Sequence, residues 1–236
     1  MKIAVINFSG NVGKSTIARH LLAPRIAGAE LIAVESINAD EGPGQSIRSR
    51  QFGDLQEYLQ TVDDVVVDIG ASNVEELLAL MHKYRGSHEE FDCYVVPTVP
   101  ALKQQQDTIA TLTALARLGI EPSRLRLVFN QVEDGTVVSA AFDLLLDFVG
   151  QNPIAPVNTL CRLGVNEVYA RIRGTGMALA DLARDETDYK ALIAKTVDTA
   201  EKLVWARKLA TRRLACGVVP ELDDCFAALE LKSTCK

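Results

Sequence analysis

The chain has 236 residues, of which 48% are hydrophobic, and this is enough to bury a substantial core in one α/β domain spanning residues 1–236. Its formal net charge of −6 and its pI near 5.2 exclude a protein that binds nucleic acid over its whole surface, so a DNA role needs a local basic face or a partner protein. The five cysteines form no C-x-x-C pair, and the N-terminus is typical of a core strand, so we expect a cytoplasmic protein. No apolar run approaches the length needed to cross a bilayer, so we expect no membrane span.

Apolar runs of the β type alternate with helical patterns in the first two thirds of the chain. The expected strands cover residues 2–7, 29–34, 64–69, 92–99 and 125–132. The expected helices lie near residues 15–27, 45–60, 73–85, 101–118 and 136–150. Because the strands are too apolar to have a wet face, this pattern predicts a three-layer α/β fold, in which a mostly parallel central sheet carries helices on both faces. Ligands of such sheets bind at the carboxyl ends of the strands.

The first strand runs directly into a glycine-rich turn, in the segment IAVINFSGNVGKST at residues 3–16. Gly10 and Gly13 allow the backbone to curl so that successive N–H groups point at a phosphate chain, and the following helix adds the positive end of its dipole. In this interpretation Lys14 reaches the β- and γ-phosphates, Ser15 ligates Mg²⁺ and Thr16 bonds a phosphate nearer the sugar. The residues expected to bind the nucleotide here are Ser9, Gly10, Asn11, Val12, Gly13, Lys14, Ser15 and Thr16.

An acidic residue ends the third expected strand, in the segment VVVD at residues 65–68. An aspartate at the tip of a hydrophobic strand is what a phosphate-binding loop site uses to hold Mg²⁺, so Asp68 joins Ser15 as a predicted metal ligand. Gly70 would permit a backbone turn close to the γ-phosphate. The alternative is that Asp68 merely caps the helix that follows.

The last third of the chain carries no motif of its own. Residues 153–160, PIAPVNTL, are a candidate edge strand, and a helical C-terminal part is expected from about residue 177. Its main element is a long helix over residues 188–215, with Leu192, Val197, Leu203 and Val204 facing inward. The basic residues of this helix form either a solvated outer face or a surface for DNA or an anionic partner; they are Lys202, Arg207, Lys208, Arg212 and Arg213.

The loop from Asn7 to Thr16 resembles the deviant phosphate-binding loop of the ParA/MinD family of partition and positioning ATPases. The pattern of that family is K-G-G-x-G-K-[ST], and its members often lack the first glycine of the general pattern G-x-x-x-x-G-K-[ST], which here falls at Phe8. Ser9 stands where the family has its signature lysine, which reaches the partner's phosphates across an ATP-sandwiched dimer, and Asn11 replaces the second glycine. The resemblance implies the P-loop NTPase fold, with hydrolysis that is weak or needs a cation supplied by a partner.

The same resemblance extends in motif order over residues 1–135 and implies roles for further residues. The segment 68–72 is similar to the family's D-x-P-P-S switch, with glycine and alanine in place of the two prolines. Relatives carry an aspartate after the second strand that orients the attacking water; here Asp40 fits by residue type and Glu35 by its distance from the strand. Asn130 matches the family's adenine-contacting asparagine, and an asparagine that only shapes a turn is the alternative. The implied catalytic residues are Lys14, Asp40 and Asp68.

The opening segment, residues 1–26, also resembles the StbB-type plasmid stability proteins, which are sometimes labelled TraL in conjugation operons. This resemblance implies a switch ATPase that binds ATP or ADP with Mg²⁺ and acts in plasmid stability, segregation or positioning. It also implies a plasmid-encoded DNA-binding partner protein and a nucleotide-dependent homodimer. Two alternatives stay open, a nucleotide-bound adaptor that does not hydrolyse ATP and a small-molecule kinase or ligase of the dethiobiotin-synthetase type.

Overall fold

The computed structural model describes residues 1–34 and 49–231, and a parallel sheet of six strands runs through these residues. The strands are β1 (Lys2–Val5), β2 (Glu30–Ala33), β3 (Val65–Asp68), β4 (Cys93–Thr98), β5 (Leu125–Val132) and β6 (Arg162–Gly164). They lie in the order β2-β3-β1-β4-β5-β6, and every neighbouring pair is parallel. The first five strands fall inside the ranges expected from the apolar runs, so the predicted parallel sheet is confirmed.

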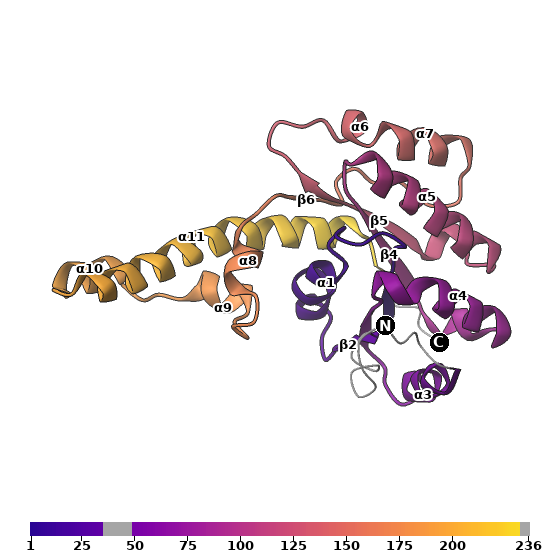
Figure 1. The fold of residues 1–236 in the computed structure, drawn as a ribbon, viewed down its shortest axis with the longest axis horizontal. Helices are drawn as coiled ribbons and strands as arrows, with labels where there is room; N and C mark the ends of the chain where they lie inside the picture. The colour runs from indigo at the N-terminus through magenta and orange to yellow at the C-terminus, as the bar shows by residue number, and fades with distance from the viewer. Residues whose placement is uncertain (35–48, 232–236) are drawn as a thin grey trace.

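Helices cover both faces of this sheet (Figure 1). One face carries α3 (Ser49–Leu59), α4 (Val74–Lys83), α5 (Leu102–Arg117), α6 (Val138–Ala141) and α7 (Asp143–Gln151). The other face carries the helical stretch of residues 14–25, which begins as α1 (Lys14–Thr16), together with α8 (Val168–Ile172), α9 (Leu179–Arg184) and α11 (Thr199–Ala228). The arrangement is the predicted three-layer α/β fold.

The two faces bury separate hydrophobic cores, because successive side chains of a strand point to opposite sides of the sheet. In β1, Ala4 belongs to the core under α3, α4, α5 and α7, whereas Ile3 and Val5 belong to the core under α8, α9 and α11. Val67 and Val66 of β3 divide in the same way. This double burial explains why the strands read as continuous apolar runs, and it leaves polar residues for the carboxyl ends of the strands.

The C-terminal region differs from the sequence prediction in two respects. The edge strand is β6, and residues 153–160 contain no strand. The helix expected over residues 188–215 is instead two helices, α10 (Tyr189–Lys195) and α11, and α11 continues to Ala228. The break lies at Asp198, whose carboxylate accepts a hydrogen bond from the N–H of Glu201 at 2.7 Å and so caps the start of α11.

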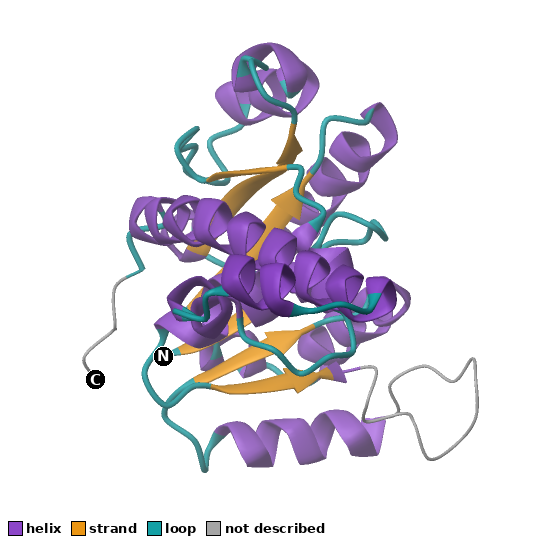
Figure 2. Cartoon of the chain, turned by 90° about the vertical axis from the view of Figure 1, so that its left-hand side faces the viewer, coloured by secondary structure: helices purple, strands orange, loops and turns teal. Residues whose placement is uncertain are grey.

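Helix α10 and the first half of α11 extend away from the sheet (Figure 1), and we call residues 189–216 the arm. Figure 2 shows the molecule with the arm's end facing the viewer. Val197, Leu203 and Val204 were predicted to face inward but are exposed. Val197 lies in the connection between α10 and α11, and Leu203 and Val204 lie on the part of α11 that extends beyond the sheet. None of the described helices combines the length and the apolar composition that crossing a membrane requires.

Candidate functional site

The glycine-rich segment forms a loop that leaves the carboxyl end of β1 and leads into α1. Strand β1 lies between β3 and β4, so the loop opens among the carboxyl ends of neighbouring parallel strands. This edge is where parallel α/β sheets bind their ligands. Val12 is completely buried, whereas Gly10 and Asn11 are exposed. One side chain therefore anchors the loop while its tip stays open to solvent.

The loop needs left-handed backbone at two positions, Asn11 with φ 60° and Gly13 with φ 89°. Asparagine is one of the few residues other than glycine that adopts this conformation readily, which explains how Asn11 can replace the second glycine of the family pattern. Gly13 has no such freedom, because a Cβ at this position would lie 2.2 Å from Nδ2 of Asn130. The curled backbone expected from the sequence is thus present, with asparagine in place of one glycine.

Asn130, near the end of β5, is packed directly against the loop. Its side-chain N–H donates to the carbonyl oxygen of Val12 at 2.9 Å, and that of the next residue, Gln131, donates to the carbonyl oxygen of Asn11 at 3.3 Å. Asn130 is buried and Gln131 is exposed. The structure therefore brings Asn130 to the loop and gives it a role in shaping the loop, while its contact with adenine stays a prediction.

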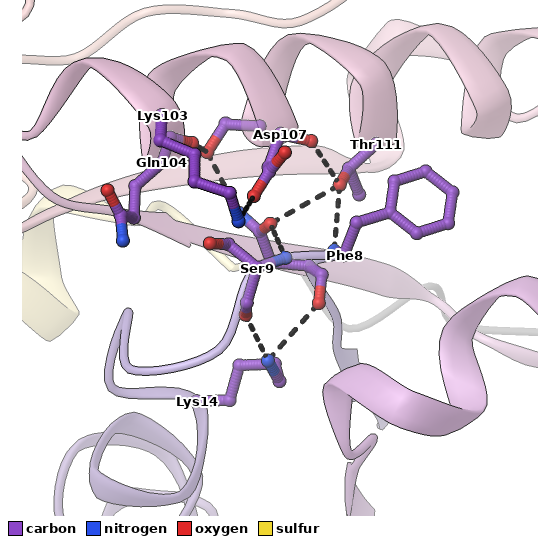
Figure 3. Close-up of polar contacts among 9 residues, drawn as sticks. Phe8, Ser9, Lys14, Lys103, Gln104, Asp107 and Thr111 are labelled. Carbon is purple, nitrogen blue, oxygen red and sulfur yellow. Dashed lines mark hydrogen bonds and ion pairs between the residues drawn. The ribbon is translucent and has the colours of Figure 1, made fainter.

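Lys14 begins α1, and its buried side chain lies under the loop (Figure 3). Its Nζ donates to the carbonyl oxygen of Asn7 at 3.1 Å and to that of Ser9 at 2.6 Å. The ammonium group is thus held by two backbone carbonyls of the segment that connects β1 to the loop. A phosphate brought to the loop would compete with these carbonyls for the same ammonium group.

Asp68 and Ser15, the residues predicted to hold Mg²⁺, come from different elements, and their metal role stays a prediction. Asp68 ends β3, is 9% exposed and is in register with Val5 of β1, two residues before Asn7. Ser15 is exposed on the first turn of the helix that follows the loop. Mg²⁺ prefers such oxygen ligands and completes its octahedral shell with phosphate oxygens and water. In residues 1–34 and 49–231, no cluster of three or more His, Cys, Asp or Glu side chains could hold a metal instead.

Ser9 lies inside the glycine-rich loop, at the position that departs from the pattern the loop resembles. The residue is 2% exposed, and its N–H donates to Oδ1 of Asn7 at 2.7 Å. The position that the resemblance aligns with a signature lysine therefore carries a short, buried side chain. Asp40 and Glu35, the candidates for orienting the attacking water, lie outside the described residues. Thr16 is the last residue of α1 and is half-buried, and its contact with a phosphate stays a prediction.

A buried polar network behind the loop was not singled out from the sequence. Asn7 and two threonines of α5, Thr108 and Thr111, are all completely buried and bonded to one another or to the loop. Polar side chains at a helical spacing of three on an otherwise apolar face were the one signal available. Asn7 lies more than a hundred residues from its partners in sequence, so spacing alone could not pair them.

Comparison with known proteins identifies the fold. No protein-family model matches the sequence, and no curated protein matches it either. Among solved structures, the cell division protein MinD from Aquifex aeolicus matches at 12% identity with a TM-score of 0.52, covering 84% of this chain and 98% of that one. MinD in the MinC:MinD complex of the same organism gives a TM-score of 0.54 at 12% identity, covering 84% and 97%. Apo McdA from Cyanothece gives 0.51 at 12% identity, covering 92% and 99%. The chain thus shares the fold of MinD and McdA.

Proposed function

We propose that this chain is a switch ATPase of the ParA/MinD type that binds MgATP and acts in plasmid stability, segregation or positioning. The observation that carries the proposal is the curled loop at the carboxyl end of the central strand β1, with the buried ammonium group of Lys14 beneath it. A fold shared with MinD and McdA supports the same conclusion. The proposal places the protein in the cytoplasm.

The loop and the start of α1 would hold the phosphates of ATP or ADP. Lys14 would exchange the carbonyls of Asn7 and Ser9 for β- and γ-phosphate oxygens, and a charge-assisted bond to phosphate is stronger than a bond to a neutral carbonyl. Ser15 and Asp68 would hold Mg²⁺, which neutralises charge on the phosphoryl group when it is bound. Asn130 is proposed to contact adenine and Asp40 to orient the attacking water.

Hydrolysis is expected to be slow because Ser9 supplies no cation to the transferred phosphate. A positive group in this role is worth about 10³–10⁵ in rate. A partner protein that contributes a lysine or arginine would therefore accelerate the reaction strongly. ATP-dependent self-association into a homodimer would last as long as ATP stays intact, which suits a switch.

We place the contact with the plasmid-encoded, DNA-binding partner protein on the arm. Residues 189–216 carry seven Lys or Arg and only two Asp or Glu, whereas the whole chain has 25 basic and 31 acidic residues. The arm is thus a basic extension of an acidic protein and favours an anionic surface. The exposed side chains of Val197, Leu203 and Val204 favour a protein surface over direct contact with DNA, because the sugar–phosphate backbone is bound mainly through charged and polar groups.

A nucleotide-bound adaptor without ATPase activity is the second candidate, and the buried Ser9 is the observation that favours it. It predicts tight binding of ATP or ADP and no turnover even with partner protein and DNA added. A dethiobiotin-synthetase-type kinase or ligase would need a set of substrate-binding groups facing the γ-phosphate, and the sequence offers no matching set. Phosphoryl transfer to a metabolite would support the kinase or ligase hypothesis.

The proposal is tested by measuring ATP affinity and turnover for wild type, Lys14→Ala and Asp68→Asn. We expect Lys14→Ala to lose binding and Asp68→Asn to lose the dependence of binding on Mg²⁺. Lys103→Ala is the matched control, because Lys103 is an exposed lysine of α5 that pairs with Asp107, one turn along the same helix. Unchanged ATP affinity in Lys14→Ala would reject the site. Sedimentation without nucleotide, with ADP and with a slowly hydrolysed ATP analogue then separates the switch from the adaptor, which should not respond.

A further inference from the structure

We infer that Asn7 is a positioning residue that couples the phosphate-binding loop to helix α5 through the hydroxyl groups of Thr108 and Thr111. The inference rests on the proposed nucleotide binding and deepens it by naming the helix that responds to the nucleotide. Asn7 lies between the end of β1 and the loop, so its backbone belongs to the segment that Lys14 contacts. Its side chain points the other way, into α5 and β4.

The amide of Asn7 is completely buried and joins three parts of the fold. Its Nδ2 donates to the carbonyl oxygen of Pro97 on β4 at 2.8 Å and to Oγ1 of Thr108 on α5 at 2.8 Å. Its Oδ1 accepts the N–H of Ser9 in the loop at 2.7 Å and lies 3.4 Å from Oγ1 of Thr111. The nitrogen and the oxygen of one amide thus both have partners, so a movement of the loop, β4 or α5 changes the hydrogen bonds to the other two.

Helix α5 reaches the loop directly as well. Oγ1 of Thr111 accepts the backbone N–H of Phe8 at 3.0 Å and donates to the carbonyl oxygen of Asp107 at 2.8 Å, as Figure 3 shows. Oγ1 of Thr108 donates to the carbonyl oxygen of Gln104 at 2.7 Å. Buried polar groups are costly to leave unpaired, so this network must shift as a unit when the loop moves.

Lys14 connects the phosphate site to this network, because its Nζ donates to the backbone carbonyls of Asn7 and Ser9. A phosphate that draws the ammonium group away releases both carbonyls at once. The side chain of Asn7 then passes the change to the first half of α5. Leu102 and Lys103 begin that half and are 62% and 78% exposed, so a nucleotide held inside the loop would be sensed on the protein surface.

The test compares variants of the threonines of α5 that remove or keep a side-chain hydroxyl group. Thr111→Val removes the hydroxyl that accepts from Phe8, and Thr111→Ser restores it without the methyl group. Thr113→Val is the matched control, because the hydroxyl of Thr113 donates to the carbonyl oxygen of Ile109 in its own helix at 2.8 Å. The measurements are the affinity for MgATP and the hydrogen exchange of the α5 amides with and without a slowly hydrolysed ATP analogue. Thr108→Val is measured alongside, so that the result stands even if Thr111→Val does not fold.

In wild type we expect the analogue to change hydrogen exchange in the first two turns of α5. Thr111→Val and Thr108→Val should bind MgATP about tenfold more weakly and lose the α5 response. Thr111→Ser and Thr113→Val should keep the response. Two results would overturn this inference and leave the proposed function standing. In the first, the wild type binds MgATP but hydrogen exchange in α5 does not change; in the second, the change in α5 persists in both Thr111→Val and Thr108→Val. A wild type that binds no nucleotide would overturn the proposed function together with it.

Discussion

Asn130 and Val12 lie 118 residues apart in sequence, yet the side-chain N–H of Asn130 donates to the carbonyl oxygen of Val12 at 2.9 Å. The bond connects the end of β5 to the glycine-rich loop, one residue before Gly13. The loop is therefore shaped by a neighbouring strand as well as by its own glycine. Variants on either side of this contact separate the two contributions.

The first prediction concerns Gly13. Alanine at this position would place its Cβ 2.2 Å from Nδ2 of Asn130 and would hold a non-glycine residue at φ 89°. We expect Gly13→Ala to lower the free energy of unfolding by about 1–3 kcal/mol, because left-handed backbone and displacement of Asn130 both cost free energy. Chemical denaturation measures the loss, and a MgATP titration should show weakened binding.

Gly10 provides the matched control in the same loop. A Cβ at Gly10 meets no atom within 4 Å, so Gly10→Ala should leave the free energy of unfolding within about 0.5 kcal/mol of wild type. Equal losses in Gly10→Ala and Gly13→Ala would contradict the idea that the crowded position limits the loop.

The second prediction concerns the bond from Asn130. Asn130→Asp turns the donor into an oxygen facing the carbonyl of Val12, in a residue that is 7% exposed. We expect the free energy of unfolding to fall by about 1–3 kcal/mol at neutral pH, since a buried acceptor is left opposite another acceptor. Gln131→Glu makes the same chemical change at the exposed neighbour and should cost less than about 0.5 kcal/mol. If the two variants are equally stable, the bond to Val12 does not support the loop.

The sheet and the loop could be predicted from the sequence because their signals are local. VVVD at residues 65–68 is apolar because both faces of β3 are covered, and the loop follows directly from β1. The network of Asn7 could not be predicted, since its bonds to Thr108 and Thr111 join residues 101 and 104 positions apart. Threonines in a helix read as weakly unfavourable until their buried partner is known.

The arm was mispredicted for a different reason. Leu203 and Val204 are apolar residues of a helix and so favour burial, but they lie beyond the sheet and are 53% and 47% exposed. The break before α11 did have a local signal. Asp198 is followed three residues later by Glu201, the spacing of a capping box, and its carboxylate accepts the N–H of Glu201.

The third prediction concerns pH. Burial, helped by the nearby charge of Arg19, lowers the pKa of His20 from 6.5 to about 4. Between these two values the unfolded chain binds a proton that the folded chain resists, so stability should fall as the pH drops from about 6.5 towards 4. His20→Gln should flatten this part of the pH dependence. Urea unfolding at several pH values measures it, with His82→Gln as the control because His82 is exposed at the end of α4. A pH dependence that is the same in wild type and His20→Gln would exclude His20 as its source.

The last prediction concerns Arg212, which fastens the arm to the connection between α9 and α10. Its Nη1 donates to the carbonyl oxygens of Asp185 at 2.9 Å and Thr187 at 2.7 Å, and its guanidinium lies 5.2 Å from the ring centre of Tyr189. Arg212→Ala removes two charge-assisted hydrogen bonds and a cation–π contact, so α10 should open more readily, by about 1–3 kcal/mol.

Hydrogen exchange of the α10 amides measures this opening directly. Arg213→Ala is the control, because Arg213 is the exposed next residue of α11 and its removal changes the net charge equally. Faster exchange in both variants would attribute the effect to charge instead of the bonds made by Arg212. Faster exchange in Arg212→Ala alone, with MgATP affinity unchanged, would show that the arm is held by its own contacts and is energetically separate from the glycine-rich loop.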